Sequence, residues 1–215
     1  MLTIYAIPPS LYCAKLRIVL RHKCLDWREL PPPGGYGSAE YKRIVPTGNL
    51  PALFDGDLLI ADGEAIAEYL EERHPAPPML PKGAADRAKM RERGRFHDTR
   101  LEPALRALFG SIVPANRDAV LNARQSAILS EKLGQLARML EAGPDLSFGL
   151  GDCGFPISFA WIDALEAPLS LSVAWPEVVA AYRARIEAEP AVAAELSAYR
   201  PILHGWVEKT AGPAA

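Results

Sequence analysis

The stretch PPSLYCAKLRIVL, residues 8–20, places polar groups at the start of a predicted helix. Ser10 directly follows two prolines, and Cys13 comes three residues later. A hydroxyl or thiol at a helix N-terminus lies beside free backbone N–H groups and the positive end of the helix dipole, which together favour an anion. These residues therefore predict chemistry on an anionic group.

The spacing within this helix separates the candidates. Cys13, Leu16 and Leu20 recur on one face, which predicts that the thiol is buried among apolar side chains. Ser10 stands immediately before the helical pattern, where serine is a favoured N-cap. Capping and chemistry remain alternative roles for Ser10 at this point.

Two further stretches carry groups that can hold a ligand. In NLPAL, Pro51 begins a strand, which indicates a fixed peptide bond after Leu50 that can be cis. In ADGEAIAEYL, Asp62 precedes a second helical pattern and is suited to cap it. A plain turn and a plain helix cap are the alternative interpretations of these two stretches.

The elements around these residues follow the order β-α-β-α-β-β-α. Pro8-Pro9 ends the first strand, and the Asp55-Gly56 turn predicts a hairpin near the end of the region. The first two strands, joined through a helix, should be parallel, and the last two antiparallel. The expected strands are 2–7, 25–30, 51–54 and 58–61, with helices from Ser10, over 38–44 and after Asp62.

A proline-rich stretch separates this region from a helical remainder. We expect a domain over 1–76, a linker over 77–85 and an all-helical domain over 86–215. The helical domain should contain a helix over 84–109 and a second that ends at EAGPD, followed by helices through AWIDALEAPL and from Pro176.

Composition excludes several classes of protein. The formal net charge is −2 over 215 residues, which does not indicate nucleic-acid binding. No run of 18 apolar residues is present, so no membrane span is expected, and the first residues do not have the pattern of a signal peptide. Three widely spaced cysteines fit neither a disulfide framework nor a metal site, which favours a cytoplasmic protein without metal.

The order of elements and these motifs resemble the soluble glutathione transferases. The resemblance rests on SLYCAKLRIVL, VPTGNLPALFDGDLLIADGEAIAEYLEERHP, the linker and WPEVVAAYRARIEAEPAV. It implies a thioredoxin-like N-terminal domain followed by an all-helical C-terminal domain, and a homodimer. Because non-catalytic relatives share this fold, the resemblance does not by itself establish activity.

The resemblance implies where glutathione would bind. The main chain of Leu50, before Pro51, would hold the cysteinyl part like an added strand, with Asn49 near the glycine end. Asp62 would pair with the γ-glutamyl ammonium. Gly63 stands where the family usually has serine, so its N–H is kept and a hydroxyl is lost, at a cost of about 1 kcal/mol.

Three residues compete to hold the glutathione sulfur as a thiolate. Ser10 is five residues before Lys15, the spacing of the Ser- and Cys-type classes, and is the favoured candidate. Cys13 would instead form mixed disulfides, and Tyr5 matches classes that use a tyrosine from the first strand. The resemblance also implies an electrophile pocket, for which Tyr12, Phe96 and Arg100 are candidates, whereas His97 receives no role.

A capping motif expected near residue 160 departs from the family pattern. The family has serine or threonine three residues before an aspartate. Here Asp163 is preceded at that distance by Ala160, and the nearest serine is Ser158. Either Ser158 caps a slightly longer helix or the motif is absent.

The resulting hypothesis is a glutathione transferase that activates the thiolate for attack on a small hydrophobic electrophile, as in detoxification. One alternative is a Cys13-dependent glutathione thiol transferase or reductase. Another is a non-catalytic binding or interaction protein that keeps the scaffold.

Overall fold

A computed structural model describes residues 1–212, and the chain divides into an N-terminal unit, Met1–Leu80, and a C-terminal unit that begins at Pro81. The N-terminal unit has the predicted order of elements. These are β1 (Leu2–Tyr5), α1 (Leu11–His22), β2 (Trp27–Leu30), α2 (Ala39–Ile44), β3 (Ala52–Asp55), β4 (Leu58–Ile60) and α3 (Gly63–Arg73).

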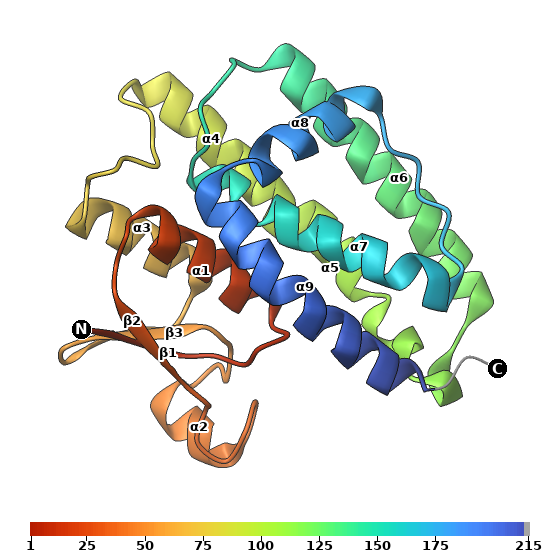
Figure 1. Cartoon of the computed structure of the whole chain (residues 1–215), viewed down its shortest axis with the longest axis horizontal. Helices are drawn as coiled ribbons and strands as arrows, with labels where there is room; N and C mark the ends of the chain where they lie inside the picture. The colour runs from red at the N-terminus through yellow and green to blue at the C-terminus, as the bar shows by residue number, and fades with distance from the viewer. Residues whose placement is uncertain (213–215) are drawn as a thin grey trace. The chain divides into compact units, whose positions relative to one another are not determined.

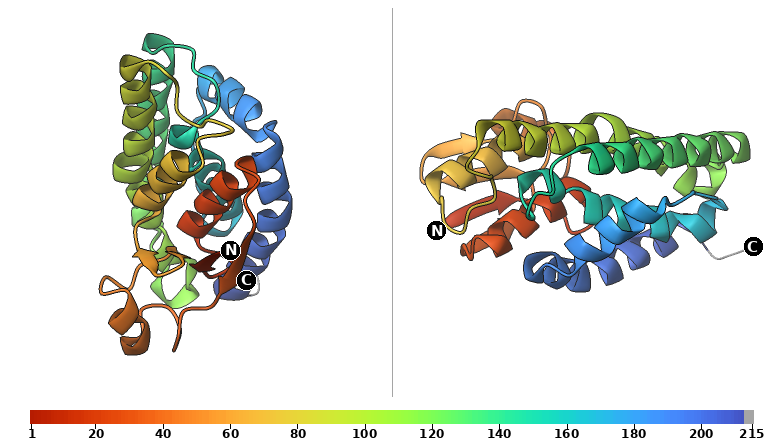
Figure 2. Two further views of the ribbon diagram at one scale, coloured as in Figure 1. Left: turned by 90° about the vertical axis from the view of Figure 1, so that its left-hand side faces the viewer. Right: turned by 90° about the horizontal axis from the view of Figure 1, so that it is seen from above.

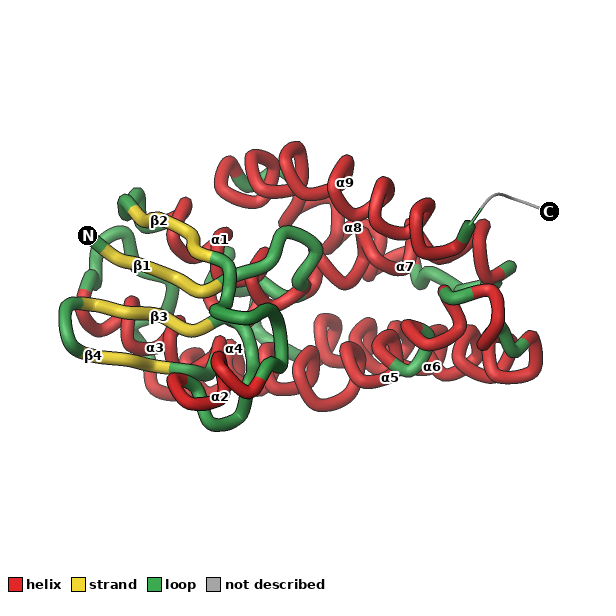
Figure 3. The backbone as a smooth tube through the Cα atoms, turned by 90° about the horizontal axis from the view of Figure 1, so that it is seen from below, coloured by secondary structure: helices red, strands yellow, loops and turns green. Residues whose placement is uncertain are grey.

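The four strands form one mixed sheet in the order β2-β1-β3-β4, as Figure 3 shows. β1 pairs in parallel with β2, and β3 pairs antiparallel with β4, as predicted. β1 also pairs antiparallel with β3. Gly56 has a φ of 59° in the turn between β3 and β4, a conformation that glycine adopts at little cost. α1 and α3 lie side by side on one face of the sheet, with α2 on the other (Figure 1).

Both helices that begin near the candidate residues have the expected caps. Ser10 is the N-cap of α1, and its Oγ accepts from the N–H of Cys13 at 3.3 Å. Asp62 is the N-cap of α3, and its Oδ1 accepts from the N–H groups of Glu64 and Ala65 at 3.0 and 2.9 Å. The capping role of each residue is therefore confirmed.

The C-terminal unit is helical throughout its described length. α4 and α6 run side by side in both views of Figure 2. The elements are α4 (Ala84–Phe96), a π-helical turn (His97–Leu101), α5 (Glu102–Arg106), 3-10 turns (Phe109–Ile112, Pro114–Asn116 and Leu150–Asp152), α6 (Ala119–Ala142), α7 (Phe155–Leu169), α8 (Glu177–Glu187) and α9 (Pro190–Ala211).

One expectation for this unit was wrong in detail. The helix expected over 84–109 is interrupted by the π turn, which coincides with the buried ring of His97. Of the two alternatives for Ser158, the structure agrees with the second. α7 begins at Phe155, so Ser158 lies within the helix and does not cap it, and the capping motif is absent. The Ser158 hydroxyl instead contacts Nε2 of His97 at 2.8 Å, while Nδ1 of the same ring contacts Asp98 at 2.7 Å.

No helix between residues 1 and 212 has the length and apolar character needed to cross a lipid bilayer.

Candidate functional site

The N-termini of α1 and α3 lie at the same end of the N-terminal unit. Lys15 of α1 pairs with Glu64 of α3 at 2.8 Å, and Lys23 at the end of α1 pairs with Glu71 at 2.6 Å. From the first ion pair to the second, the residue numbers rise along both α1 and α3. The two helices therefore run in the same direction. The positive ends of both helix dipoles therefore lie at one end of the helix pair.

Pro51 lies at this same end, which unites three separate stretches of sequence. A Cβ atom added at Gly63, the first residue of α3, would lie 3.8 Å from Cδ of Pro51 and 4.0 Å from Cδ1 of Tyr12. The Leu50-Pro51 peptide bond is cis, as the sequence indicated. Tyr12 in the first turn of α1, the cis-proline and the start of α3 therefore surround one small region.

Ser10 presents a half-exposed hydroxyl at the mouth of α1. Its oxygen accepts from the N–H of Cys13, so its own hydrogen remains available to donate. Accepting a bond from a helix end also polarises the hydroxyl and strengthens it as a donor. The capping role and a donor role to a bound anion are therefore compatible.

Cys13 is fully buried in α1, in agreement with the predicted apolar stripe. Burial raises the pKa of the Cys13 thiol, and the nearby Ser10 side chain acts in the opposite direction. A thiol that keeps its proton and has no access to solvent is a poor nucleophile. These properties argue against chemistry at Cys13.

Tyr5 packs within the N-terminal unit. Its ring makes edge contacts with Tyr41 and Phe54, each at a centroid distance of 5.5 Å. Since Tyr41 belongs to α2, the Tyr5 ring lies on the α2 face of the sheet, whereas α1 and Ser10 lie on the other. This arrangement favours a packing role for Tyr5 over a catalytic one.

The segment before the cis-proline has a free main-chain edge. Among residues 1–212, neither the N–H nor the C=O of Leu50 has a hydrogen-bond partner. The hydroxyl of Tyr41 holds this segment in place by donating to the carbonyl of Asn49 at 2.7 Å. Asn49 is itself exposed. The edge can therefore accept an extended ligand as an added strand.

The start of α3 also keeps one free donor. Asp62 caps the N–H groups of Glu64 and Ala65 through Oδ1, and the N–H of Gly63 has no partner between residues 1 and 212. Asp62 is exposed, and its Oδ2 stays available to accept from a cation. The site thus offers an N–H donor for a carboxylate beside an acceptor for an ammonium group.

The remaining candidates lie in different parts of the chain. Tyr12 is half-buried in the N-terminal unit. In the C-terminal unit, Phe96 is half-buried at the end of α4 and Arg100 is exposed within the π turn. No role of these three residues follows from their local geometry alone.

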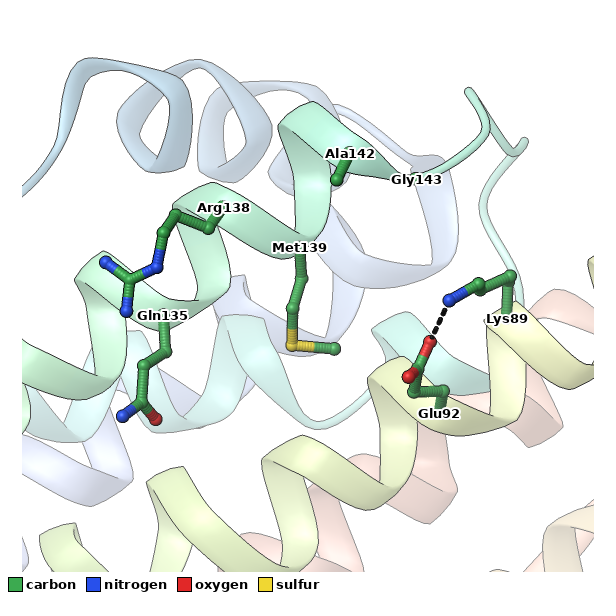
Figure 4. A pocket seen from close by; sticks show the side chains of 7 residues that line it. All are labelled: Lys89, Glu92, Gln135, Arg138, Met139, Ala142 and Gly143. Carbon is green, nitrogen blue, oxygen red and sulfur yellow. Dashed lines mark hydrogen bonds and ion pairs between the residues drawn. The ribbon is translucent and has the colours of Figure 1, made fainter.

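A groove between α4 and α6 does not match the expected electrophile pocket. It has a volume of about 370 Å³ and contains none of the predicted pocket residues. Figure 4 shows the ion pair of Lys89 and Glu92 on its α4 side and polar groups of α6 opposite. Its lining residues are Lys89, Glu92, Gln135, Arg138, Met139, Ala142 and Gly143.

Sequence reasoning did not find the contacts of Tyr41 and Glu64 with the site. Tyr41 supports the turn at Asn49, and Glu64 pairs with Lys15 across 49 residues of sequence. Nothing in the local pattern around either residue signals these contacts. Within residues 1–212, no cluster of three or more His, Cys, Asp or Glu side chains is arranged to hold a metal ion.

Comparisons with known proteins find similarity to glutathione transferases. Residues 4–78 match the family model of the glutathione S-transferase N-terminal domain. Over 90 residues the chain is 39% identical to glutathione S-transferase Z1 of Arabidopsis thaliana, which covers 40% of this chain and 41% of that protein. It is 33% identical over 90 residues to a stringent starvation protein A homolog of Pasteurella multocida, covering 42% of each.

The structural similarity extends further along the chain. A solved glutathione transferase of Bombyx mori superposes with a TM-score of 0.80 at 20% sequence identity, covering 95% of this chain and 97% of that one. At this identity the match shows the fold alone. In sequence, the chain spans only about two fifths of the length of the curated relatives above.

Proposed function

We propose that this protein binds glutathione and activates its thiolate, because residues 4–78 match the family model of the glutathione S-transferase N-terminal domain and the chain has the glutathione transferase fold. The convergence of Tyr12, Pro51 and Gly63 carries the proposal. Three groups that can bind a ligand lie at this end of the N-terminal unit: the free main-chain edge at Leu50, the unused N–H of Gly63 and the hydroxyl of Ser10.

Each part of glutathione has a matching group in the proposed complex. The N–H and C=O of Leu50 bind the cysteinyl main chain, and Asn49 lies toward the glycine end. The N–H of Gly63 donates to the γ-glutamyl carboxylate, while Asp62 accepts from the ammonium group of the same moiety.

Ser10 then donates to the glutathione sulfur. A hydroxyl donor together with the α1 dipole should lower the pKa of the bound thiol by about one to three pH units. The thiol proton leaves to solvent, and the sulfur lone pair forms a bond to the electrophilic atom of a small hydrophobic substrate. The bond from that atom to the leaving group breaks, and the leaving group departs into solvent with the electron pair of that bond. Tyr12, Phe96 and Arg100 are proposed to contact that substrate.

Glutathione binding and thiolate formation can be measured separately. Titration calorimetry gives the dissociation constant, and the ultraviolet absorbance of the thiolate, followed against pH, gives the pKa of the bound thiol. Ser10→Ala should raise that pKa while changing the dissociation constant little. Full thiolate formation in Ser10→Ala would remove Ser10 from the catalytic role.

A non-catalytic binding protein is the second candidate. Gly63 in place of the family's serine favours it, as does the similarity to a relative that is not named as an enzyme. Glutathione binding without thiolate formation, and without turnover in a screen of electrophiles, would support this alternative. The buried Cys13 gives no such support to a thiol transferase.

We further propose that the protein is a cytoplasmic homodimer with a role in detoxification. Light scattering coupled to size-exclusion chromatography measures its mass directly. A monomer at micromolar concentration would contradict the proposed dimer.

A further inference from the structure

An ion pair joins the two helices that begin at the proposed glutathione site. Nζ of Lys15 lies 2.8 Å from Oε2 of Glu64. The Lys15 side chain is 4% exposed and that of Glu64 is 22% exposed. Lys15 follows Ser10 by five residues, and Glu64 directly follows Gly63. The pair therefore lies within one helical turn or two of the groups proposed to bind glutathione.

The pair matters because Glu64 carries a negative charge where the ligand carboxylate is expected. Asp62 and Glu64 flank Gly63, whose N–H is the proposed donor to the γ-glutamyl carboxylate. Oδ1 of Asp62 already accepts from two N–H groups of the helix end, so its charge is compensated locally. The charge of Glu64 is compensated by the ammonium of Lys15.

We propose that Lys15 is a positioning residue of the glutathione site, which allows the start of α3 to accept a carboxylate by neutralising Glu64. The inference rests on the proposed function. Without the ammonium, a partly buried glutamate beside Gly63 would repel the γ-glutamyl carboxylate. Repulsion between the Glu64 carboxylate and the γ-glutamyl carboxylate should weaken glutathione binding about tenfold.

The chain contains a matched control. Lys23 and Glu71 join the same two helices at their opposite ends, at 2.6 Å, with side chains that are 0% and 10% exposed. Lys23 also donates to the carbonyls of His74 and Pro77. This second pair therefore stabilises the helix pair without lying near Gly63.

Calorimetric titration with two ligands tests the role of Lys15. One ligand is glutathione, and the other is 4-aminobutyryl-cysteinyl-glycine, which lacks the γ-glutamyl carboxylate. Lys15→Met should bind glutathione about tenfold more weakly than the unaltered protein does. Its affinity for the decarboxylated ligand should equal that of the unaltered protein. Lys15→Met/Glu64→Gln should recover most of the lost affinity, because it removes the repelling charge.

Glu64→Gln provides a second measurement, which is informative even if Lys15→Met fails to fold. It keeps the ammonium and should bind glutathione as tightly as the unaltered protein or more tightly. The control Lys23→Met/Glu71→Gln should lower the melting temperature and leave the dissociation constant unchanged, measured where it is folded.

Three results would overturn the inference. They are unchanged glutathione binding in Lys15→Met, equal weakening for both ligands, and a Glu64→Gln variant that binds as weakly as Lys15→Met. Failure of the unaltered protein to bind glutathione has a different meaning, because it overturns the proposed function and this inference together.

Discussion

Gly63 faces the ring of Pro51 across a gap that a side chain can fill. A Cβ atom at Gly63 would lie 3.8 Å from Cδ of Pro51, an ordinary van der Waals distance, and Gly63 does not have a positive φ. Neither the backbone conformation nor the available space therefore requires glycine at this position. The missing side chain is therefore expected to matter for the proposed glutathione site and not for the fold.

Gly63→Ser should therefore strengthen glutathione binding. The new hydroxyl can donate to the γ-glutamyl carboxylate beside the existing N–H, which is worth about 1 kcal/mol, or about fivefold in affinity. Gly205→Ser, at an exposed position of α9, controls for the general effect of serine on a helix. Unchanged or weaker binding in Gly63→Ser would place the carboxylate elsewhere.

Tyr41→Phe should weaken glutathione binding without changing the pKa of the bound thiol. It removes the hydroxyl that donates to the Asn49 carbonyl and leaves the segment before the cis-proline less firmly held. The expected loss is about 1 kcal/mol in the free energy of unfolding and about threefold in affinity. Tyr69→Phe, which removes a comparable bond to Asp55, should reduce stability alone.

Thiol labelling should distinguish the three cysteines. Cys24 is exposed, whereas Cys13 and Cys153 are buried. A chromogenic disulfide reagent should therefore modify one thiol quickly in the native protein and the other two only after unfolding. Rapid modification of Cys13, identified by mass spectrometry, would restore the thiol transferase alternative.

Stability should fall at alkaline pH because of Cys13. Burial raises the pKa of its thiol in the native state, so the folded protein retains a proton that the unfolded chain releases. Its contribution to stability is fully present below the ordinary cysteine pKa of about 8.5 and is lost as the pH rises above it. Denaturant titrations from pH 7 to 10 should show a shallower decline in Cys13→Ala than in the unaltered protein.

Gly154→Ala should strongly destabilise the C-terminal unit. A Cβ atom at Gly154 would lie 2.4 Å from the ring of His97, which is itself held by Asp98 and Ser158. Overpacking of this kind costs about 3 kcal/mol in the free energy of unfolding. Gly110→Ala, where no heavy atom lies within 4 Å, should cost little, and equal stability of the two variants would contradict the packing at His97.

The amino-acid sequence was sufficient to predict the local features of the N-terminal unit. The prolines and Ser10 predicted the start of α1, Asp62 predicted the cap of α3, and the Asp55-Gly56 turn predicted the hairpin. These features depend on groups that lie within a few residues of one another, so their physical causes can be recognised in the sequence. The spacing of Cys13 with Leu16 and Leu20 likewise predicted its burial.

How these local features combine depends on contacts between residues that are distant in the sequence. Lys15 meets Glu64 across 49 residues, and Gly63 lies beside both Pro51 and Tyr12 because α1 and α3 run in the same direction. In the C-terminal unit, the sequence left open whether Ser158 caps a helix, and in the structure it bonds to His97, 61 residues away. A polar side chain that bonds to a residue far away in the sequence is not available to cap its own helix. The spacing of residues within its own segment does not identify that distant partner.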